Sequence, residues 1–458
     1  MPFRVRSIRG LLAVTSWLGF SVAISTAAEP LRLSFEEAIR LASRAGAQTR
    51  LQLAAEAELV AESQLKQVRA QTGLQFNAGL SDRILRFDLR SIGIDFPQVS
   101  PFVANVALPN VVGPFTVINS QVHLSKSVVN RSAARQIEAA RESAESVKAQ
   151  SKSVAAEITA QTAKAYLEAL RAKSDVDLAA ENVSLSQGRL NFASERRANG
   201  IVTGGDVRRA NLDVAEARQA LFAAQTSYRS AILQLVALIG VPFETSVELT
   251  EQAVYRPEDI SVAASVQAAF RSRPELGATD LEVESLRLKA QAIAAESRPT
   301  LAVFADAGAL TVAPTPNNDS AIVSSPTYTA GFEFRLPILD GGRRAGQRAE
   351  IESQIRQANI REQALRRQIE LQVRMAVESL QAAAQQVELA RQQSTLAAEN
   401  SDETQARYAA GEASSIELAD AEARLSRSRH DYTQAVYQHQ AARIALAEAT
   451  GDIVGMKW

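Results

Sequence analysis

Apolar and polar positions alternate along four short stretches of the chain. In the first stretch, Leu74 and Phe76 begin a run in which every second residue is apolar, the period of a β-strand with one buried face. The weakest of the four runs has Phe304 and Asp306 on the same face. We therefore predict strands at about 73–83, 115–125, 300–311 and 327–337.

Elsewhere the apolar positions follow a helical period. Neither glycine nor proline occurs within 131–187 or within 347–410, and the 64 residues of the latter stretch would span about 95 Å as one helix. In that stretch Ile351, Ile355 and Ala358 begin the three-four spacing of a coiled-coil seam. The chain is therefore expected to be mainly α-helical, with unusually long helices.

This pattern occurs twice. The stretch that begins at Leu33 aligns with the one that begins at Ile260, and each half reads helix, strand, loop, strand, very long helix, break and helix. Ser34 and Glu37 form a capping-box pair, which opens a helix expected to run to about Gln71. We predict a first repeat over 29–241, a linker over 242–257, a second repeat over 258–452 and a C-terminal tail over 453–458, with linker and tail wrapped around the middle of the helices.

The N-terminal segment has the composition of a secretory signal peptide. Three arginines precede an apolar stretch that begins at Leu11, and small residues follow up to Ala28. We therefore predict a signal peptide over 1–28, with a single membrane anchor as the alternative. The chain has no cysteine, so neither a disulfide nor a lipid-modified N-terminus is expected.

Composition and motifs do not indicate an enzyme. The net charge of -1 leaves no basic footprint for nucleic acid. Gly341 and Gly346 have the spacing of a phosphate-binding loop, but the lysine and the hydroxyl residue that such a loop needs are missing. The histidines are scattered, and we predict that His430 and His439 lie at the surface. We expect no catalytic residue, no cofactor and no metal site.

The four strands are expected to cross a membrane. At about ten residues each they have the length of a tilted transmembrane β-strand, with one apolar face and one polar face, and His123 is expected to face the lumen. Four strands cannot close a barrel, and lipid does not tolerate unpaired strand edges, so closure requires other copies of the chain. Three copies would give a 12-stranded barrel, within the range of known barrels. The alternative is a soluble periplasmic coiled-coil scaffold or adaptor protein whose sheet has one wet face.

The residues that follow the last strand form a specific motif. Leu336-Pro-Ile-Leu-Asp-Gly-Gly-Arg-Arg344 resembles the strand-to-helix signature of the TolC-type outer-membrane factor family. The stretches 197–207 and 407–421 are also similar to the family's helical turns, and the resemblance covers essentially the whole chain after the signal peptide. In this signature the strand-to-helix turn consists of Pro337, Asp340, Gly341 and Gly342.

The resemblance implies a specific assembly and function. The protein would be a homotrimer, with a 12-stranded barrel in the outer membrane of a Gram-negative bacterium and a 12-helix periplasmic tunnel. It would be a passive conduit that a periplasmic adaptor protein joins to an inner-membrane transporter, in drug efflux or type I secretion. Drug, metal and polypeptide cargo all fit such a tube.

Two helical turns are expected at the periplasmic tip. A helix that stops and reverses favours glycine, because a positive φ costs glycine least. The resemblance implies that these turns contact the adaptor protein. The residues concerned are Gly200 and Ile201 in the first repeat and Gly411 and Glu412 in the second.

The resemblance also implies a gate near these turns. Acids ring the closed entrance in the family, and each carboxylate would occur three times in a trimer, which favours cations. The alternative is local, because Thr203 with Asp206 and Ser414 with Glu417 fit the capping-box pattern. Ala413 occupies the position of the family's latch arginine, so a salt-bridged latch of that kind is not expected. The predicted gating residues are Asp206, Glu417, Asp420 and Tyr408.

Overall fold

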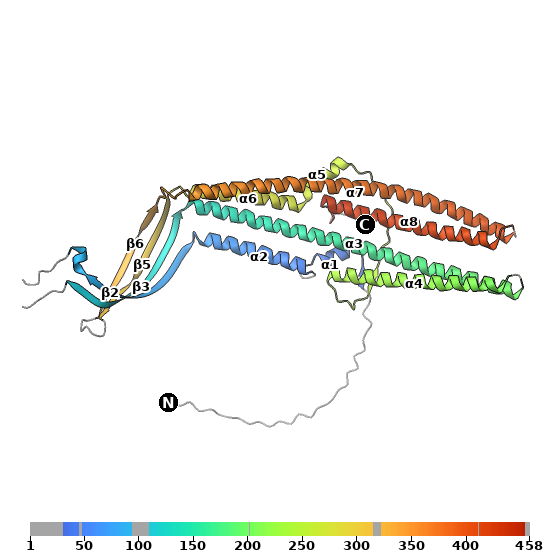
Figure 1. The fold of residues 1–458 in the computed structure, drawn as a ribbon, viewed down its shortest axis with the longest axis horizontal. Helices are drawn as coiled ribbons and strands as arrows, with labels where there is room; N and C mark the ends of the chain where they lie inside the picture. Colours follow the sequence, from blue (N-terminus) through green and yellow to red (C-terminus); the bar gives the residue numbers. More distant parts are fainter. Residues whose placement is uncertain are drawn as a thin grey trace, which may run out of the picture.

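The computed structural model describes residues 31–44, 48–93, 110–200, 202–314, 322–410 and 412–453. The molecule is elongated, with a β-sheet at one end and a layer of long helices extending from it (Figure 1). The predicted signal peptide, Ile201, Gly411 and the tail after residue 453 lie outside the described residues.

The order of elements repeats once along the chain. The first half contains β1 (Leu31–Leu33), α1 (Phe35–Ala42), α2 (Thr49–Ala70), β2 (Leu74–Asp88), the 3-10 helix η1 (Leu89–Ile92), β3 (Val111–Val129), α3 (Arg131–Ala198) and α4 (Gly204–Ile239). The second half contains β4 (Val247–Leu249), α5 (Val262–Ser272), α6 (Pro274–Ala295), β5 (Thr300–Pro314), β6 (Val323–Arg335), α7 (Arg343–Ala409) and α8 (Ser415–Thr450).

The large sheet has the strand order β2-β3-β5-β6, and all its pairings are antiparallel. Its register aligns Phe76 with Leu124, Leu124 with Ala305, and Ala305 with Ala330. Residues that face one another across a ladder share a side of the sheet, so the apolar positions of all four strands lie on one face. Among the described strands, β2 and β6 each have one neighbour and are the edges.

The predicted strand ranges are too short at the end of the sheet away from the helices. β3 begins at Val111 rather than 115, and β6 begins at Val323 rather than 327. Pro114 and Pro326 lie inside these strands, although the sequence pattern treats proline as a strand breaker. Pro326 is tolerated because β6 is an edge strand, where one side of the backbone has no ladder to complete. β2 and β5 likewise extend to residues 88 and 314, whereas β6 ends at residue 335, before Pro337.

The helices form a single layer. Next to the sheet the order is α2, α3, α6, α7, and farther away it is α4, α3, α8, α7 (Figure 1). α3 and α7 run through both halves with 68 and 67 residues, and α3 continues through Gly188, past the end of the stretch without glycine and proline. No helix in the described part of the chain combines the length and the apolar character needed to cross a bilayer.

The helix predicted from Ser34 to Gln71 is in fact two helices. Ser34 caps α1, because its Oγ accepts a hydrogen bond from Glu37 N at 3.2 Å. α1 ends at Ala42 and α2 begins at Thr49. The break lets α1 pack its buried residues on α3, while α2 runs beside α3 toward the sheet.

The main hydrophobic core lies where the two halves of the helix layer meet. Tyr166 is fully buried, its ring meets Phe35 edge-on at 5.8 Å, and its hydroxyl donates to Leu33 O at 3.1 Å. β1 and β4 pair in parallel beside it, which attaches the first described residues to the linker. The core therefore joins β1 and α1 to α3, α4, β4 and α8, which are distant in sequence.

The linker crosses from the first repeat to α8 and is bound there by three side chains. Gln440 Nε2 donates to Val254 O at 2.5 Å, and the Tyr255 ring meets His439 edge-on at 4.8 Å. Arg443 pairs with Glu258 at 2.6 Å. His439 is only 1% exposed, so its predicted surface position is wrong: the linker covers it.

Candidate functional site at the helical tip

The turn between α3 and α4 lies at the end of the layer opposite the sheet (Figure 1). Gly200 has φ +74 and donates its N–H to Arg197 O at 2.9 Å, which ends α3. No atom lies within 4 Å of the position that a Cβ would take. The positive φ, rather than lack of space, therefore favours glycine here.

The turn between α7 and α8 occupies the same end. Glu412 N donates to Arg407 O at 2.8 Å, which closes the end of α7. Glu412 itself is exposed. Both turns thus present exposed residues at the end of the molecule, and their contact with an adaptor protein stays a prediction.

Asp206 caps its own helix. Its Oδ2 accepts hydrogen bonds from Thr203 N at 2.9 Å and from Thr203 Oγ1 at 2.7 Å. These bonds favour the carboxylate and hold the pKa of Asp206 below its ordinary value. Asp206 is therefore an ionised, exposed carboxylate in the first turn of α4.

The other two predicted gating acids belong to α8, and only the carboxylate of Asp420 has a side-chain partner among the described residues. Ser414 Oγ accepts from Glu417 N at 3.2 Å, and Asp420 pairs with Arg424 one turn later in α8 at 2.9 Å. Glu417 and Asp420 are exposed. No described contact joins these acids to one another within the chain, so a ring of carboxylates would require further copies.

Tyr408 lies in an aromatic and cationic cluster that the sequence did not predict. Its ring meets Phe192 of α3 at 6.3 Å in a T-shaped arrangement. The guanidinium of Arg196 stacks over both rings, 4.7 Å from the Phe192 centroid and 5.2 Å from that of Tyr408. A cation from the first repeat therefore contacts Tyr408.

The same cluster borders a cavity of about 390 Å³ between the two repeats. Asp206 and Tyr408 both line it, whereas Glu417 and Asp420 are not among its lining residues. Arg189 of α3 and Glu422 of α8 also line it and pair at 3.4 Å. The structure thus brings together two of the four predicted gating residues. The spacing of Phe192 and Arg196, one helical turn apart, is the only local signal of the cluster that the sequence offers.

The strand-to-helix turn after β6 is organised by Asp340. Its Oδ1 accepts from Gly342 N at 3.2 Å, and its Oδ2 accepts from Arg344 N at 3.0 Å and Arg344 Nε at 2.5 Å. These bonds lower the pKa of Asp340 to about 2. Gly341 and Gly342 have φ +64 and +86, which explains why the motif has two glycines after Pro337.

The polar face of the sheet contains a small network. His123 Nδ1 lies 2.6 Å from Asp306 Oδ1, and Gln121 Nε2 donates to the same oxygen at 3.2 Å. The Phe304 ring stacks on the His123 ring at 6.4 Å. Phe304 and Asp306 lie on the same face of β5, and both contact His123 there. This shared contact accounts for an aromatic residue on the polar face, which weakened the alternation in the sequence.

Comparison with known proteins gives the same fold. Residues 265–452 match the family model described as outer membrane efflux protein. The chain is 26% identical over 197 residues to protein CyaE of Bordetella pertussis; the match covers 42% of this chain and 41% of CyaE, so the chain aligns with less than half of that relative.

Two solved structures cover nearly the whole chain. The Campylobacter jejuni CmeC outer membrane channel superposes with a TM-score of 0.71 at 14% identity, over 91% of this chain and 85% of that one. The outer membrane protein VceC of Vibrio cholerae does so with a TM-score of 0.70 at 18% identity, over 91% and 96%. The family match thus lies in the second repeat, and over 91% of its length the chain has the fold of these two outer-membrane proteins.

Proposed function

We propose that this protein is the outer-membrane channel of a tripartite efflux pump or of a type I secretion system. Three copies would combine their sheets into a 12-stranded barrel and their helices into a periplasmic tunnel. The observation that carries the proposal is a sheet with one apolar face and two open edges, whose strands continue directly into helices of about 100 Å.

The open edges support closure by further copies. In lipid an unpaired N–H or C=O group costs several kcal/mol. Within the described sheet, β2 and β6 each leave one side without a neighbour. Because β2 and β6 are the two outer strands of the same sheet, pairing β6 of one copy with β2 of the next would satisfy both edges in a ring.

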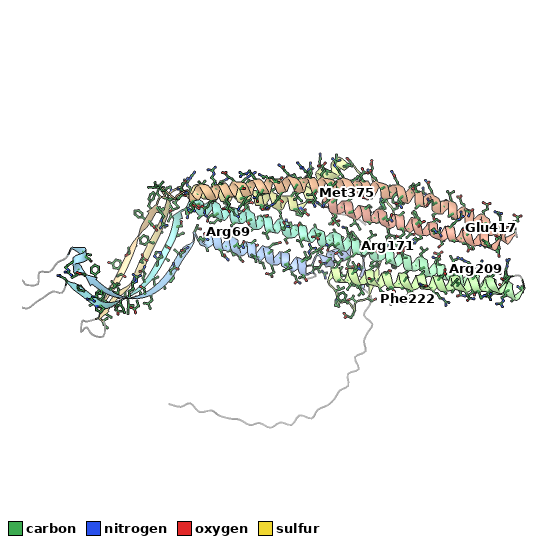
Figure 2. All side chains as sticks on the ribbon, viewed as in Figure 1. Arg69, Arg171, Arg209, Phe222, Met375 and Glu417 are labelled. Atoms are coloured by element: carbon green, nitrogen blue, oxygen red, sulfur yellow. The ribbon has the colours of Figure 1, made fainter. Side chains whose placement is uncertain are left out.

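The helix layer has matching apolar edges. α7 lies along one edge, and α2 with α4 along the other, and Figure 2 shows Met375 and Phe222 on these opposite edges. Several large apolar residues of α7 are exposed and fall within one stripe of the helix, as do three of α4. The α7 stripe contains Ile360, Leu371, Met375, Leu389 and Leu396, and the α4 stripe contains Leu212, Phe222 and Leu233.

The alternative, a soluble periplasmic scaffold or adaptor, fits the sheet less well. Phe76 is 68% exposed, Phe332 75% and Tyr328 88%, all on the same face. A soluble protein rarely leaves such an apolar surface open to water, whereas a membrane strand presents it to lipid.

In the proposed assembly the tip faces the periplasm. We propose that its two turns contact a periplasmic adaptor protein, which links the channel to an inner-membrane transporter. Asp206, Glu417 and Asp420 would then form rings of carboxylates around the entrance, and Tyr408 would contribute to its closure. The exposure of the three acids supports this arrangement.

Extraction from an outer-membrane fraction tests the proposal. The expected result is a detergent-stable trimer that forms a conducting pore in a planar lipid bilayer. Phe222→Asp should convert the trimer to monomers by placing a charge in the apolar contact, whereas Ser227→Asp, an exposed position about 140° around α4 from Phe222, should leave it trimeric. A water-soluble monomer or dimer of the unaltered chain would support the scaffold instead.

A further inference from the structure

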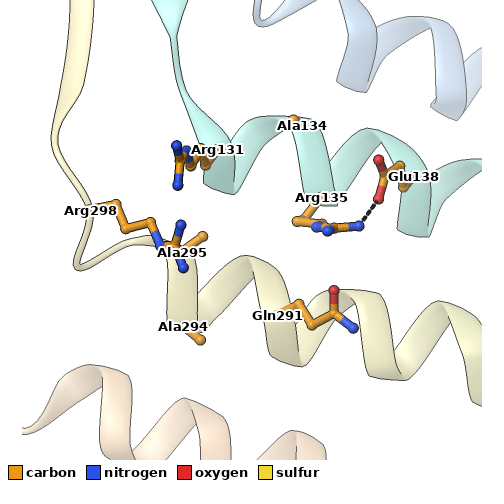
Figure 3. A pocket seen from close by; sticks show the side chains of 8 residues that line it. All are labelled: Arg131, Ala134, Arg135, Glu138, Gln291, Ala294, Ala295 and Arg298. Carbon is orange, nitrogen blue, oxygen red and sulfur yellow. Dashed lines mark hydrogen bonds and ion pairs between the residues drawn. The ribbon is translucent and has the colours of Figure 1, made fainter.

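A pocket of about 520 Å³ opens between the first turns of α3 and the last turns of α6. Its lining contains three arginines, Arg131, Arg135 and Arg298, and one carboxylate, Glu138 (Figure 3). Arg135 and Glu138 pair with each other at 2.5 Å. Two further guanidinium groups, those of Arg131 and Arg298, line the pocket and take no part in this ion pair.

These two arginines differ from their neighbours at the junction of sheet and helices. Arg343 pairs with Glu296 at 2.7 Å. The guanidinium groups of Arg131 and Arg298 make no hydrogen bond or ion pair with any residue that the structure describes. Figure 3 shows both side chains at the strand end of the pocket, on facing elements. Two like charges in one pocket disfavour each other, and an anion between them would stabilise both.

The pocket also has room and local polarity for such an anion. Ala134, Ala294 and Ala295 form part of its lining, so no large side chain fills it. Arg131 is the first residue of α3, so the positive end of that helix lies at the pocket. Guanidinium groups bind the oxygens of phosphate in a bidentate manner, which selects phosphate over a simple halide.

We propose that this pocket binds a phosphate-bearing anion at the boundary between sheet and helices. Arg131 lies two residues after the end of β3, and Arg298 lies two residues before β5. If the sheet spans the outer membrane, a step that rests on the proposed function, this boundary lies at the level of the phospholipid head groups. The phosphate group is then either the phosphodiester of a phospholipid or free inorganic phosphate from the periplasm.

Native mass spectrometry of the detergent-extracted full chain tests the site. The probes are phosphatidylglycerol, phosphatidylcholine and inorganic phosphate, each added alone. The double variant Arg131→Gln/Arg298→Gln is compared with Arg141→Gln, which removes an exposed arginine of α3 that lies outside the pocket lining. Loss of each charge-assisted contact should weaken binding by about tenfold, so the double variant should lose about 100-fold and the control nothing.

The outcomes separate the two sources. Retention of phosphatidylglycerol over phosphatidylcholine, lost in the double variant alone, supports a lipid ligand. Binding of inorganic phosphate that is lost in the same variant, without lipid preference, supports a soluble ligand. Equal binding of every probe by the unaltered chain and the double variant overturns the proposal. The phosphate measurement does not require a trimer or a membrane, so its failure is distinct from failure of the channel function.

Discussion

α3 and α8 meet at the middle of the molecule and again toward the tip, and the two contacts differ in chemistry. At the middle, Tyr437 is buried and its hydroxyl donates to Leu170 O at 3.1 Å, within the main hydrophobic core. Toward the tip, the contact is polar and only partly buried, as in the hydrogen bond from Ser426 Oγ to Asn182 Oδ1 at 2.9 Å. The same two helices thus change from a buried seam at the middle to a polar seam toward the tip.

This difference indicates which part of the helix layer is the more stable against local unfolding. Burial of apolar surface stabilises the middle, where the linker also crosses between the repeats. Polar contacts that water can replace contribute little net free energy. The tip should therefore open locally at a lower free energy than the middle.

The largest effect is expected at Tyr166. Tyr166→Ala removes a fully buried ring from the core and should lower the free energy of unfolding by about 3–5 kcal/mol. Tyr408→Ala, at the partly exposed tip cluster, should cost only about 1 kcal/mol. Thermal unfolding of both variants measures the contrast. Equal losses would mean that the tip is as firmly packed as the middle.

Acid should weaken the middle through His439. Burial, followed by the nearby positive charge of Arg443, holds the pKa of His439 below its ordinary value, against the opposing charge of Glu258. The unfolded chain therefore takes up a proton near pH 6.5 that the folded chain resists, so stability falls as the pH drops below that value. Between pH 7.5 and 5, the free energy of unfolding should change less with pH in His439→Gln than in the unaltered chain. An unchanged slope would exclude His439 as its source.

The polar seam should respond less than either of the buried residues Tyr166 and His439. Removal of one side of its hydrogen bond, in Asn182→Ala or Ser426→Ala, should lower global stability by about 1 kcal/mol or less. Hydrogen exchange should nevertheless become faster in the tip halves of α3 and α8, because local opening no longer breaks that bond. Faster exchange at the middle of the same helices would show that the two seams open together.

The smallest effect is expected at Asp206. Asp206→Asn weakens the cap of α4, so amide exchange should increase in its first turn and remain unchanged at the buried seam. Because the folded chain favours the carboxylate, the cap is fully present above the ordinary pKa of aspartate and is lost as the pH falls through the lowered pKa. In strong acid the exchange rate of the unaltered chain should therefore approach that of the variant. If the two rates stay apart in strong acid, the capping role is contradicted.

Two differences between sequence prediction and structure have a common cause. Phe304 and Asp306 weakened a strand prediction because each was assessed within its own strand, although both contact His123 of a strand far away in the sequence. His439 was predicted at the surface because its own helix does not cover it, whereas the linker does. In each case the deciding contact joins segments that local periodicity treats separately.

The sequence by itself determined which kinds of element occur and in what order, but not the ends of the strands or the break between α1 and α2. The two long helices, the four strands with an apolar face, the cap at Asp206 and the turn at Asp340 all follow from interactions within a few residues, and such interactions leave a readable period or spacing. Only the tertiary structure decided that β3 pairs with β5, that Arg196 stacks on Tyr408, and that the linker binds α8. These contacts depend on how the two repeats lie against each other, because packing of complementary surfaces, and not residue spacing, selects the partners.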